Sequence, residues 1–141
     1  MPTLHRSNEA NIPALHRIRL SVRENRLNDP ARLTETAYYP FIAAQGETWH
    51  AEVEGRIAGF GTLDHEGQSI WALFVDPRFE GIGLGKLLLS KLIEQARVQQ
   101  MPSISLVTTP GTRAEAFYIR CGWQADGLTE SGECRLTLTL G

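Results

Sequence analysis

The sequence has few cysteines, no long apolar run and no large excess of one charge, and each of these absences argues against a class of protein. Its two cysteines, Cys121 and Cys134, form neither a metal-binding spacing nor a disulfide framework, which predicts free thiols in a reducing compartment and a cytoplasmic protein. The four histidines are scattered, so we expect no metal site. No apolar stretch approaches the roughly 18 residues that cross a membrane, and the first residues lack the apolar core of a signal peptide.

Charge and length set further limits. The formal net charge of −2 argues against nucleic-acid binding, which usually needs a basic stripe. A hydrophobic content of 42% and a charged content of 21% are typical of a soluble globular protein. Because 141 residues suffice to build one core, we expect a single domain over residues 1–141.

The most informative segment is 74–89, where an apolar strand runs into three alternate glycines and then an amphipathic helix. Gly81, Gly83 and Gly85 have no Cβ, so backbone N–H groups can come close to a bulky anion there. The start of the following helix adds unpaired N–H groups and a partial positive charge. This combination predicts a seat for a phosphate or pyrophosphate.

Two common phosphate-binding loops do not fit the spacing. A Walker A loop needs Ser or Thr where this chain has Leu87, and Gly where it has Glu80. A Rossmann fingerprint reads G-x-G-x-x-G, whereas the glycines here run G-x-G-x-G, with Lys86 next. A nucleotide hydrolase is therefore disfavoured.

The flanks of the glycines carry a family resemblance. V-D-P, a short spacer, G-x-G-x-G-K and a Leu-rich helix resemble the acetyl-CoA loop of the GNAT (GCN5-related) N-acetyltransferase superfamily. Residues 114–118, read as AEAFY and followed by Gly122-Trp123, resemble the family's A-x-x-F-Y-x-x-x-G-[FW] segment. One helix and one strand fit between the two motifs, as the family requires. The resemblance is good over residues 49–125.

The apolar patterns and turn residues are consistent with the order β-α-α-β-β-β-α-β-α-β-β. The resemblance implies the same order, in a mixed sheet with helices on both sides, which periodicity alone would not fix. The expected strands are 2–6, 48–53, 56–63, 69–75, 104–108, 123–126 and 134–140, and the expected helices are 9–22, 31–44, 83–99 and 112–120. The resemblance implies the same α/β (α+β mixed sheet) GNAT-like fold, with strands 69–75 and 104–108 splayed apart to admit the cofactor. The alternating strand 134–140 could leave an edge, so a homodimer through the C-terminal strands is a further expectation.

The resemblance also implies where acetyl-CoA, as acetyl-donor cosubstrate, would bind. The backbone of the glycine-rich turn would hold the pyrophosphate, and the strand before it would pair with the pantetheine arm. The implied cofactor-binding residues are Leu73, Phe74, Val75, Gly81, Ile82, Gly83, Leu84, Gly85, Lys86, Thr109 and Arg113. Two positions depart from the family: Glu80 replaces a usual Gln or Arg, and Gly111 replaces an Asn that contacts the cofactor in many members.

Tyr118 is the predicted general acid. A phenol with a pKa of about 10 is protonated at neutral pH and can donate its proton to the departing thiolate. The ordinary alternative is a core tyrosine whose hydroxyl caps a buried carbonyl. No strong general base is evident. The carboxylates on the expected substrate side are Glu24, Asp29, Glu35, Glu52 and Asp64, and a water chain or an acceptor of low pKa would make a base unnecessary.

The acceptor is expected to bind residues 21–45, where the family varies most. Arg23, Asn25 and Tyr38 are the predicted substrate-binding residues, with Arg23 as a clamp for a carboxylate, although such residues ordinarily cap helices and pack on surfaces. Polyamines, aminoglycosides, amino acids, peptide N-termini and protein lysines all stay open. We therefore expect an acetyl-CoA-dependent N-acetyltransferase that moves the acetyl group directly to a primary amine of a small molecule, peptide or protein. The alternative is a non-catalytic acyl-CoA-binding or regulatory module with the same fold.

Overall fold

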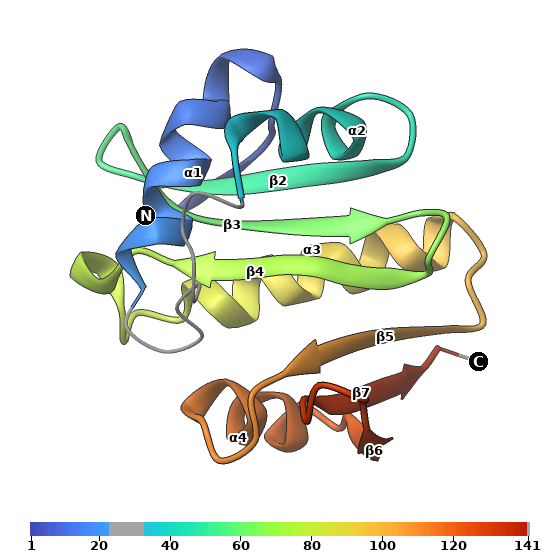
Figure 1. Cartoon of the computed structure of the whole chain (residues 1–141). Helices are drawn as coiled ribbons and strands as arrows, with labels where there is room; N and C mark the ends of the chain where they lie inside the picture. Colours follow the sequence, from blue (N-terminus) through green and yellow to red (C-terminus); the bar gives the residue numbers. More distant parts are fainter. Residues whose placement is uncertain (23–32, 141) are drawn as a thin grey trace.

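The computed structural model describes residues 1–22 and 33–140, which build a seven-stranded sheet with helices on both faces (Figure 1). The strands are β1 (Thr3–Arg6), β2 (Gly46–Val53), β3 (Arg56–Asp64), β4 (Ser69–Val75), β5 (Ser103–Thr108), β6 (Gln124–Leu128) and β7 (Cys134–Thr139). The helices are α1 (Ile12–Ser21), α2 (Tyr39–Ile42), α3 (Leu84–Val98) and α4 (Arg113–Arg120), with 3-10 turns η1 (Glu9–Asn11), η3 (Glu35–Tyr38) and η4 (Pro77–Phe79). The predicted fold class and element order are confirmed, and none of the described helices is long and apolar enough to span a membrane.

The sheet order is β1-β2-β3-β4-β5-β7-β6, and β4–β5 is its parallel pair. Apolar side chains of α1, such as Ile18, pack with Phe60 on one face of the sheet. Leucines of α3 pack on the other face, where a Cβ on Gly61 would lie only 2.8 Å from Leu92 Cδ1. The glycine therefore lets α3 approach the sheet closely.

A buried carboxylate joins β2, α3 and the β3–β4 turn. Glu47 is 1% exposed and accepts hydrogen bonds from Trp49 Nε1 at 2.7 Å and Gln95 Nε2 at 2.9 Å, with His65 Nε2 at 2.8 Å. Burial alone raises the pKa of Glu47, but the hydrogen bonds from Trp49, Gln95 and His65 outweigh it and lower the pKa below its ordinary value. The network is structural, because none of these four residues lies in the groove described below.

The two N-terminal helices differ from their predicted bounds. Asn8 caps the chain with a capping box, as expected, but the first turn is the 3-10 turn η1 and α1 begins only at Ile12. The predicted helix 31–44 is wrong in its described part, which holds η3 and the short α2 instead. Pro40 lies in the first turn of α2, because proline fits there and would clash inside a longer helix.

The expectation that strand 134–140 forms an edge is also wrong. β7 pairs with β5 on one side and β6 on the other, so β6 is the outer strand at this end of the sheet. All residues of β6 are exposed. The strand predicted over residues 123–126 corresponds to β6, but a local pattern does not show which of the two C-terminal strands pairs with β5.

The predicted separation of β4 and β5 is confirmed. Their ladder consists of the single pair Ser69↔Ser105, and the two strands diverge toward η4 (Figure 1). Just after this pair, β4 bulges against β3: Thr62 pairs with Ala72 and Leu63 with Ile70, so Trp71 has no partner. A bulge bends a strand locally, and this one lies where β4 leaves β5.

Candidate active site

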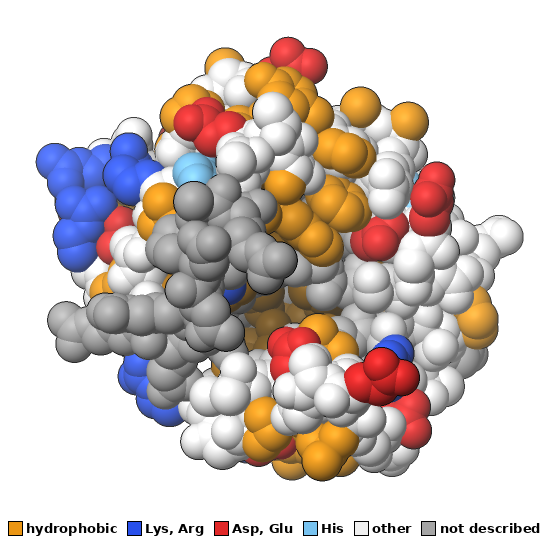
Figure 2. All heavy atoms as spheres, viewed as in Figure 1, with side chains coloured by type: hydrophobic (Ala, Val, Ile, Leu, Met, Phe, Trp, Pro, Cys, Tyr) orange, Lys and Arg blue, Asp and Glu red, His pale blue; other side chains and the backbone are white. Residues whose placement is uncertain are grey.

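A groove of about 740 Å³ lies between β4 and β5. The face shown in Figure 2 is hollowed in this region, with hydrophobic side chains on the floor of the hollow. Side chains of α1, η3, β4, β5, α4 and the β6–β7 turn line the groove, so it joins both faces of the sheet. Because β5 pairs with β4 only at Ser69, the backbone N–H and C=O groups of the rest of β4 on that side have no partner strand.

The predicted strand residues occupy this open edge. Leu73 and Phe74 line the groove. Val75 lies one residue further along and faces the start of α3, since a Cβ on Gly85 would come within 4.0 Å of Val75 Cγ2. An extended ligand could add to β4 here as a strand does, with main-chain hydrogen bonds for affinity.

The glycine-rich turn has the backbone that an anion seat requires. Gly81 and Gly83 have positive φ angles of 82° and 86°, and no atom lies within 4 Å of the place where a Cβ would stand on either. Gly83 is the N-cap of α3 and has no side-chain cap, so the first N–H groups of that helix have no capping acceptor. Leu84 is buried and anchors the turn, whereas Ile82 and Lys86 are exposed.

Two ion pairs flank this turn. Arg113 Nη2 lies 3.7 Å from Glu80 Oε2, which places a cation beside the carboxylate that departs from the family pattern. Arg78 does not pair with Glu80, because its Nη2 lies 2.8 Å from Asp76 Oδ2. The side-chain hydrogen bond from Arg78 lowers the pKa of Asp76 below its ordinary value. The predicted cofactor residue Arg113 is thus brought to the glycine-rich turn.

The start of α4 explains the second departure. Gly111 has a φ angle of 78°, and its N–H donates to Glu115 Oε1 at 3.0 Å. Thr112 caps α4 by accepting from the Glu115 N–H at 3.2 Å, and its own hydroxyl donates to the Thr109 carbonyl at 2.8 Å. This turn needs a positive φ at position 111, which glycine supplies readily. Thr109, a predicted cofactor-binding residue, lines the groove.

Tyr118 of α4 lines the groove. The residue is 6% exposed, and its ring packs edge-on against Phe117 and Trp123. Burial raises the pKa of Tyr118 above its ordinary value, so the phenol stays protonated. Within the described residues its hydroxyl has no hydrogen-bond partner, and the carbonyl cap of the ordinary alternative is therefore not present there.

The acceptor-side predictions have mixed outcomes. Tyr38 lines the groove, with its hydroxyl 3.1 Å from His16 Nδ1 and its ring edge-on to Trp71. Burial raises the pKa of Tyr38 to about 12. Arg23 and Asn25 lie outside the described residues.

None of the predicted carboxylates lines the groove among those described. Glu52 instead contacts His50 at 3.2 Å, Asp64 accepts backbone N–H groups in a turn, and Glu35 lies in η3. Glu24 and Asp29 lie outside the described residues.

Two charged residues that the sequence reasoning missed do line the groove, Arg19 of α1 and Glu133 before β7. Neither belongs to a motif, so no local signal could have found them. In residues 1–22 and 33–140, no group of histidine, cysteine, aspartate and glutamate side chains could hold a metal ion.

Comparison with known proteins identifies the family of the chain. The model of the Acetyltransferase (GNAT) family matches residues 12–123. GCN5-related N-acetyltransferase 2, chloroplastic, of Arabidopsis thaliana is 31% identical over 87 residues, which are 60% of this chain and 33% of that protein. The chain spans less than half the length of the curated relatives it matches.

Solved structures share the whole fold. An N-acetyltransferase from Staphylococcus aureus Mu50 superposes with a TM-score of 0.85 at 16% identity, covering 100% of this chain and 99% of that one. The yncA protein of Salmonella typhimurium, solved with its cofactor acetyl-CoA, superposes with a TM-score of 0.80 at 17% identity, covering 100% and 95%. Because the family model matches most of the length of this chain, the chain belongs to the acetyltransferase (GNAT) family.

Proposed function

We propose that this protein is an acetyl-CoA-dependent N-acetyltransferase that transfers the acetyl group directly to a primary amine. The observation that carries the proposal is an open strand edge in one groove with Tyr118, whose hydroxyl has no hydrogen-bond partner among the described residues; a glycine-rich helix start follows that strand in the chain. A βα turn that only reverses the chain would not require these three features in combination. That relatives are named N-acetyltransferases, and that a structural neighbour was solved with acetyl-CoA, supports the same function.

The chain's own residues divide the binding between two regions. The backbone of Gly81 to Lys86, at the start of α3, holds the pyrophosphate, and Arg113 stands beside it through its contact with Glu80. The open edge of β4 at Leu73 and Phe74 pairs with the pantetheine arm. The bound cosubstrate supplies the acetyl group as a thioester.

Each chemical step has a candidate group in the groove. Free N–H groups of β4 donate to the thioester carbonyl as negative charge develops on its oxygen. The amine nitrogen forms the new C–N bond as the C–S bond breaks, so the amine loses a proton and the sulfur gains one. Tyr118 donates its proton to sulfur, and the proton that the amine loses passes to water, from which the phenolate is reprotonated. A thiolate in the same poorly solvated site is also more basic than in water, which keeps the transfer feasible although burial weakens the phenol as an acid.

The two departures from the family pattern favour the alternative, a module that binds acyl-CoA without turnover. Glu80 puts a carboxylate at the edge of the anion seat, and Gly111 removes a side chain that contacts the cofactor in many members. Arg113 offsets the first, and α4 retains Tyr118 in the groove. Catalysis is therefore the better supported reading.

Calorimetric titration with acetyl-CoA, with CoA and ATP as controls, tests binding, and release of the CoA thiol with a panel of primary amines tests turnover. We expect micromolar binding of acetyl-CoA, no heat with ATP and thiol release with at least one amine. Binding without thiol release from any amine would support the non-catalytic module. No binding of acetyl-CoA or CoA would refute both.

Two accompanying predictions concern setting and assembly. Cys121 and Cys134 are free thiols, which suits a reducing compartment such as the cytoplasm, while the related Arabidopsis protein is named chloroplastic. A homodimer would now use the outer strand β6 instead of β7, and light scattering of the purified protein tests it.

A further inference from the structure

We propose that the acceptor is a small molecule with both an amine and a carboxylate, the chemistry of an amino acid, and that Arg19 binds its carboxylate. This inference rests on the proposed function and deepens it. It names a residue that no motif pointed to, at the α1 side of the groove.

Within residues 1–22 and 33–140, the guanidinium of Arg19 has no counter-ion. Its Cζ lies 4.3 Å from the centre of the Phe74 ring, a cation–π contact that satisfies no N–H donor. Arg19 Nη1 is buried and has no hydrogen-bond partner, and no described carboxylate lies within ion-pair distance of the side chain. A charge held against an aromatic ring with a buried donor unpaired is unfavourable, and no described residue supplies the acceptor, so we infer that a ligand does.

A carboxylate is the ligand group that this side chain suits best. The guanidinium presents its donors as a planar fork that matches two carboxylate oxygens. The aromatic contact with Phe74 holds the side chain in place before a ligand arrives, which lowers the entropy lost on binding. Tyr38 lines the same part of the groove and limits the size of the acceptor.

The groove also offers a site for the amine. Glu133 is the one carboxylate lining it among the described residues, and its Oε1 accepts from Ser131 Oγ at 3.2 Å. It attracts an ammonium group and can accept the proton that the amine loses on acetylation. Among the described lining residues there is one cation and one anion, a pair that matches a zwitterion and would disfavour a polyamine, which carries only positive charges.

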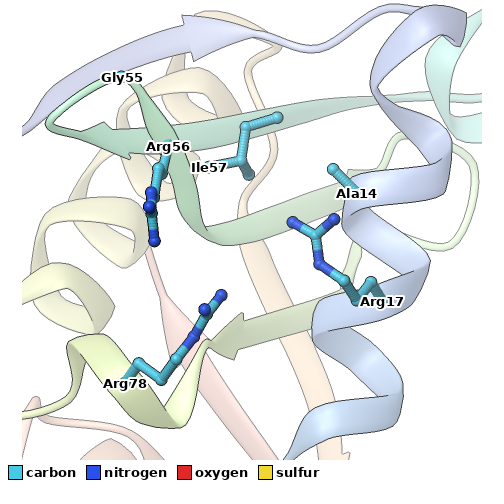
Figure 3. A pocket seen from close by; sticks show the side chains of 6 residues that line it. All are labelled: Ala14, Arg17, Gly55, Arg56, Ile57 and Arg78. Carbon is cyan, nitrogen blue, oxygen red and sulfur yellow. The ribbon is translucent and has the colours of Figure 1, made fainter.

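A neighbouring arginine gives a matched control. Arg17, on the same helix, lies in a separate pocket where it faces Arg56 and Arg78 (Figure 3). Arg17→Gln and Arg19→Gln remove the same charge from the same helix, but only the second removes it from the groove. Arg17→Gln therefore reports the effect of charge loss on the fold and on long-range attraction.

The decisive experiment compares α- and ω-amino acids with their carboxamides, using release of the CoA thiol by the wild-type protein. We expect the best acid to exceed its carboxamide at least tenfold in kcat/KM. Arg19→Gln should raise the KM for the acid at least tenfold, leave the KM for the carboxamide within twofold and leave acetyl-CoA binding unchanged. Arg17→Gln should change none of these values, and Arg19→Lys should recover part of the loss.

Equal rates with acids and carboxamides, or a preference for polyamines, would overturn the inference while leaving the proposed function intact. An equal loss on both substrates in Arg19→Gln would also overturn it, because Arg19 would then act on the fold. If acetyl-CoA binds and no amine is acetylated, the proposed function and this inference fail together. The wild-type comparison of acid with carboxamide decides the matter even if Arg19→Gln does not fold.

Discussion

Replacement of Tyr118 by Phe separates chemistry from folding. The change deletes one oxygen from a ring that is 6% exposed and leaves the packing of that ring on Phe117 and Trp123 intact. Because the hydroxyl has no partner among the described residues, its loss leaves no buried donor or acceptor unsatisfied there. We expect the free energy of unfolding to change by less than about 1 kcal/mol.

The rate should respond very differently. A general acid contributes a factor of roughly 10²–10⁴, which corresponds to about 2.7–5.4 kcal/mol in the activation barrier. We expect Tyr118→Phe to lower kcat by such a factor, because phenylalanine has no hydroxyl that could donate a proton to the departing thiolate. Affinity for acetyl-CoA should stay within twofold. Since burial raises the pKa of Tyr118, the wild-type rate should show no decline from phenol ionisation below the ordinary phenol pKa of about 10.

Three measurements check this reasoning: thiol release under saturating substrates, calorimetric binding of acetyl-CoA, and urea unfolding. Tyr39→Phe is the matched control, because Tyr39 is 45% exposed and does not line the groove. An unchanged kcat in Tyr118→Phe would refute the role of general acid. A loss of more than about 2 kcal/mol in stability would show that the hydroxyl has a structural partner.

Further predictions concern the Glu47 network and the glycine-rich turn. Glu47→Leu should lower the free energy of unfolding by about 2–4 kcal/mol in urea titrations, because the N–H donors of Trp49 and Gln95 are left partly buried without an acceptor. The isosteric Glu47→Gln should lose less, and equal losses would contradict this account. The pKa of Glu47 is lower in the folded than in the unfolded chain, so the ionised carboxylate stabilises the fold above the ordinary pKa of 4.5. This stabilisation is lost as the pH falls through the folded pKa. On acidification, the free energy of unfolding should therefore fall less in Glu47→Gln than in the wild type. Gly83→Ala and the control Gly55→Ala should each cost about 1–2 kcal/mol in stability, because both positions have positive φ angles with open space around them. Only Gly83→Ala should weaken acetyl-CoA binding in calorimetry, and equal binding by the two variants would argue against the pyrophosphate seat.

Local motifs made part of this structure predictable. The turn at Gly81 to Gly85 and the helix that carries Tyr118 depend on residues close together in sequence, so their pattern predicts both the elements and their order. The strand assignments were similarly reliable where apolar residues alternate or run together, as in β4 and β5.

Features that depend on distant parts of the chain were not predictable. Arg19 and Glu133 meet on one groove only because α1 and the β6–β7 turn both reach it in the folded chain. The bulge at Trp71 is a matter of register between β3 and β4, which no local pattern encodes. The region around Pro40 misled the helix prediction, since its apolar spacing suits a helix longer than the proline allows.

The single pair that links β4 to β5 has a consequence for cooperativity. Strands β1 to β4 form one hydrogen-bonded block and β5, β7 and β6 form another, joined at Ser69↔Ser105 and by packing against α3. A ligand that pairs with β4 in the groove would connect the two blocks through additional contacts. Without it, the C-terminal block should open at a lower free energy than the rest, and its amide hydrogens should exchange faster. Ligand binding should then slow amide hydrogen exchange most in β5 and β7. A protein with an occupied groove should therefore unfold more cooperatively than one with an empty groove.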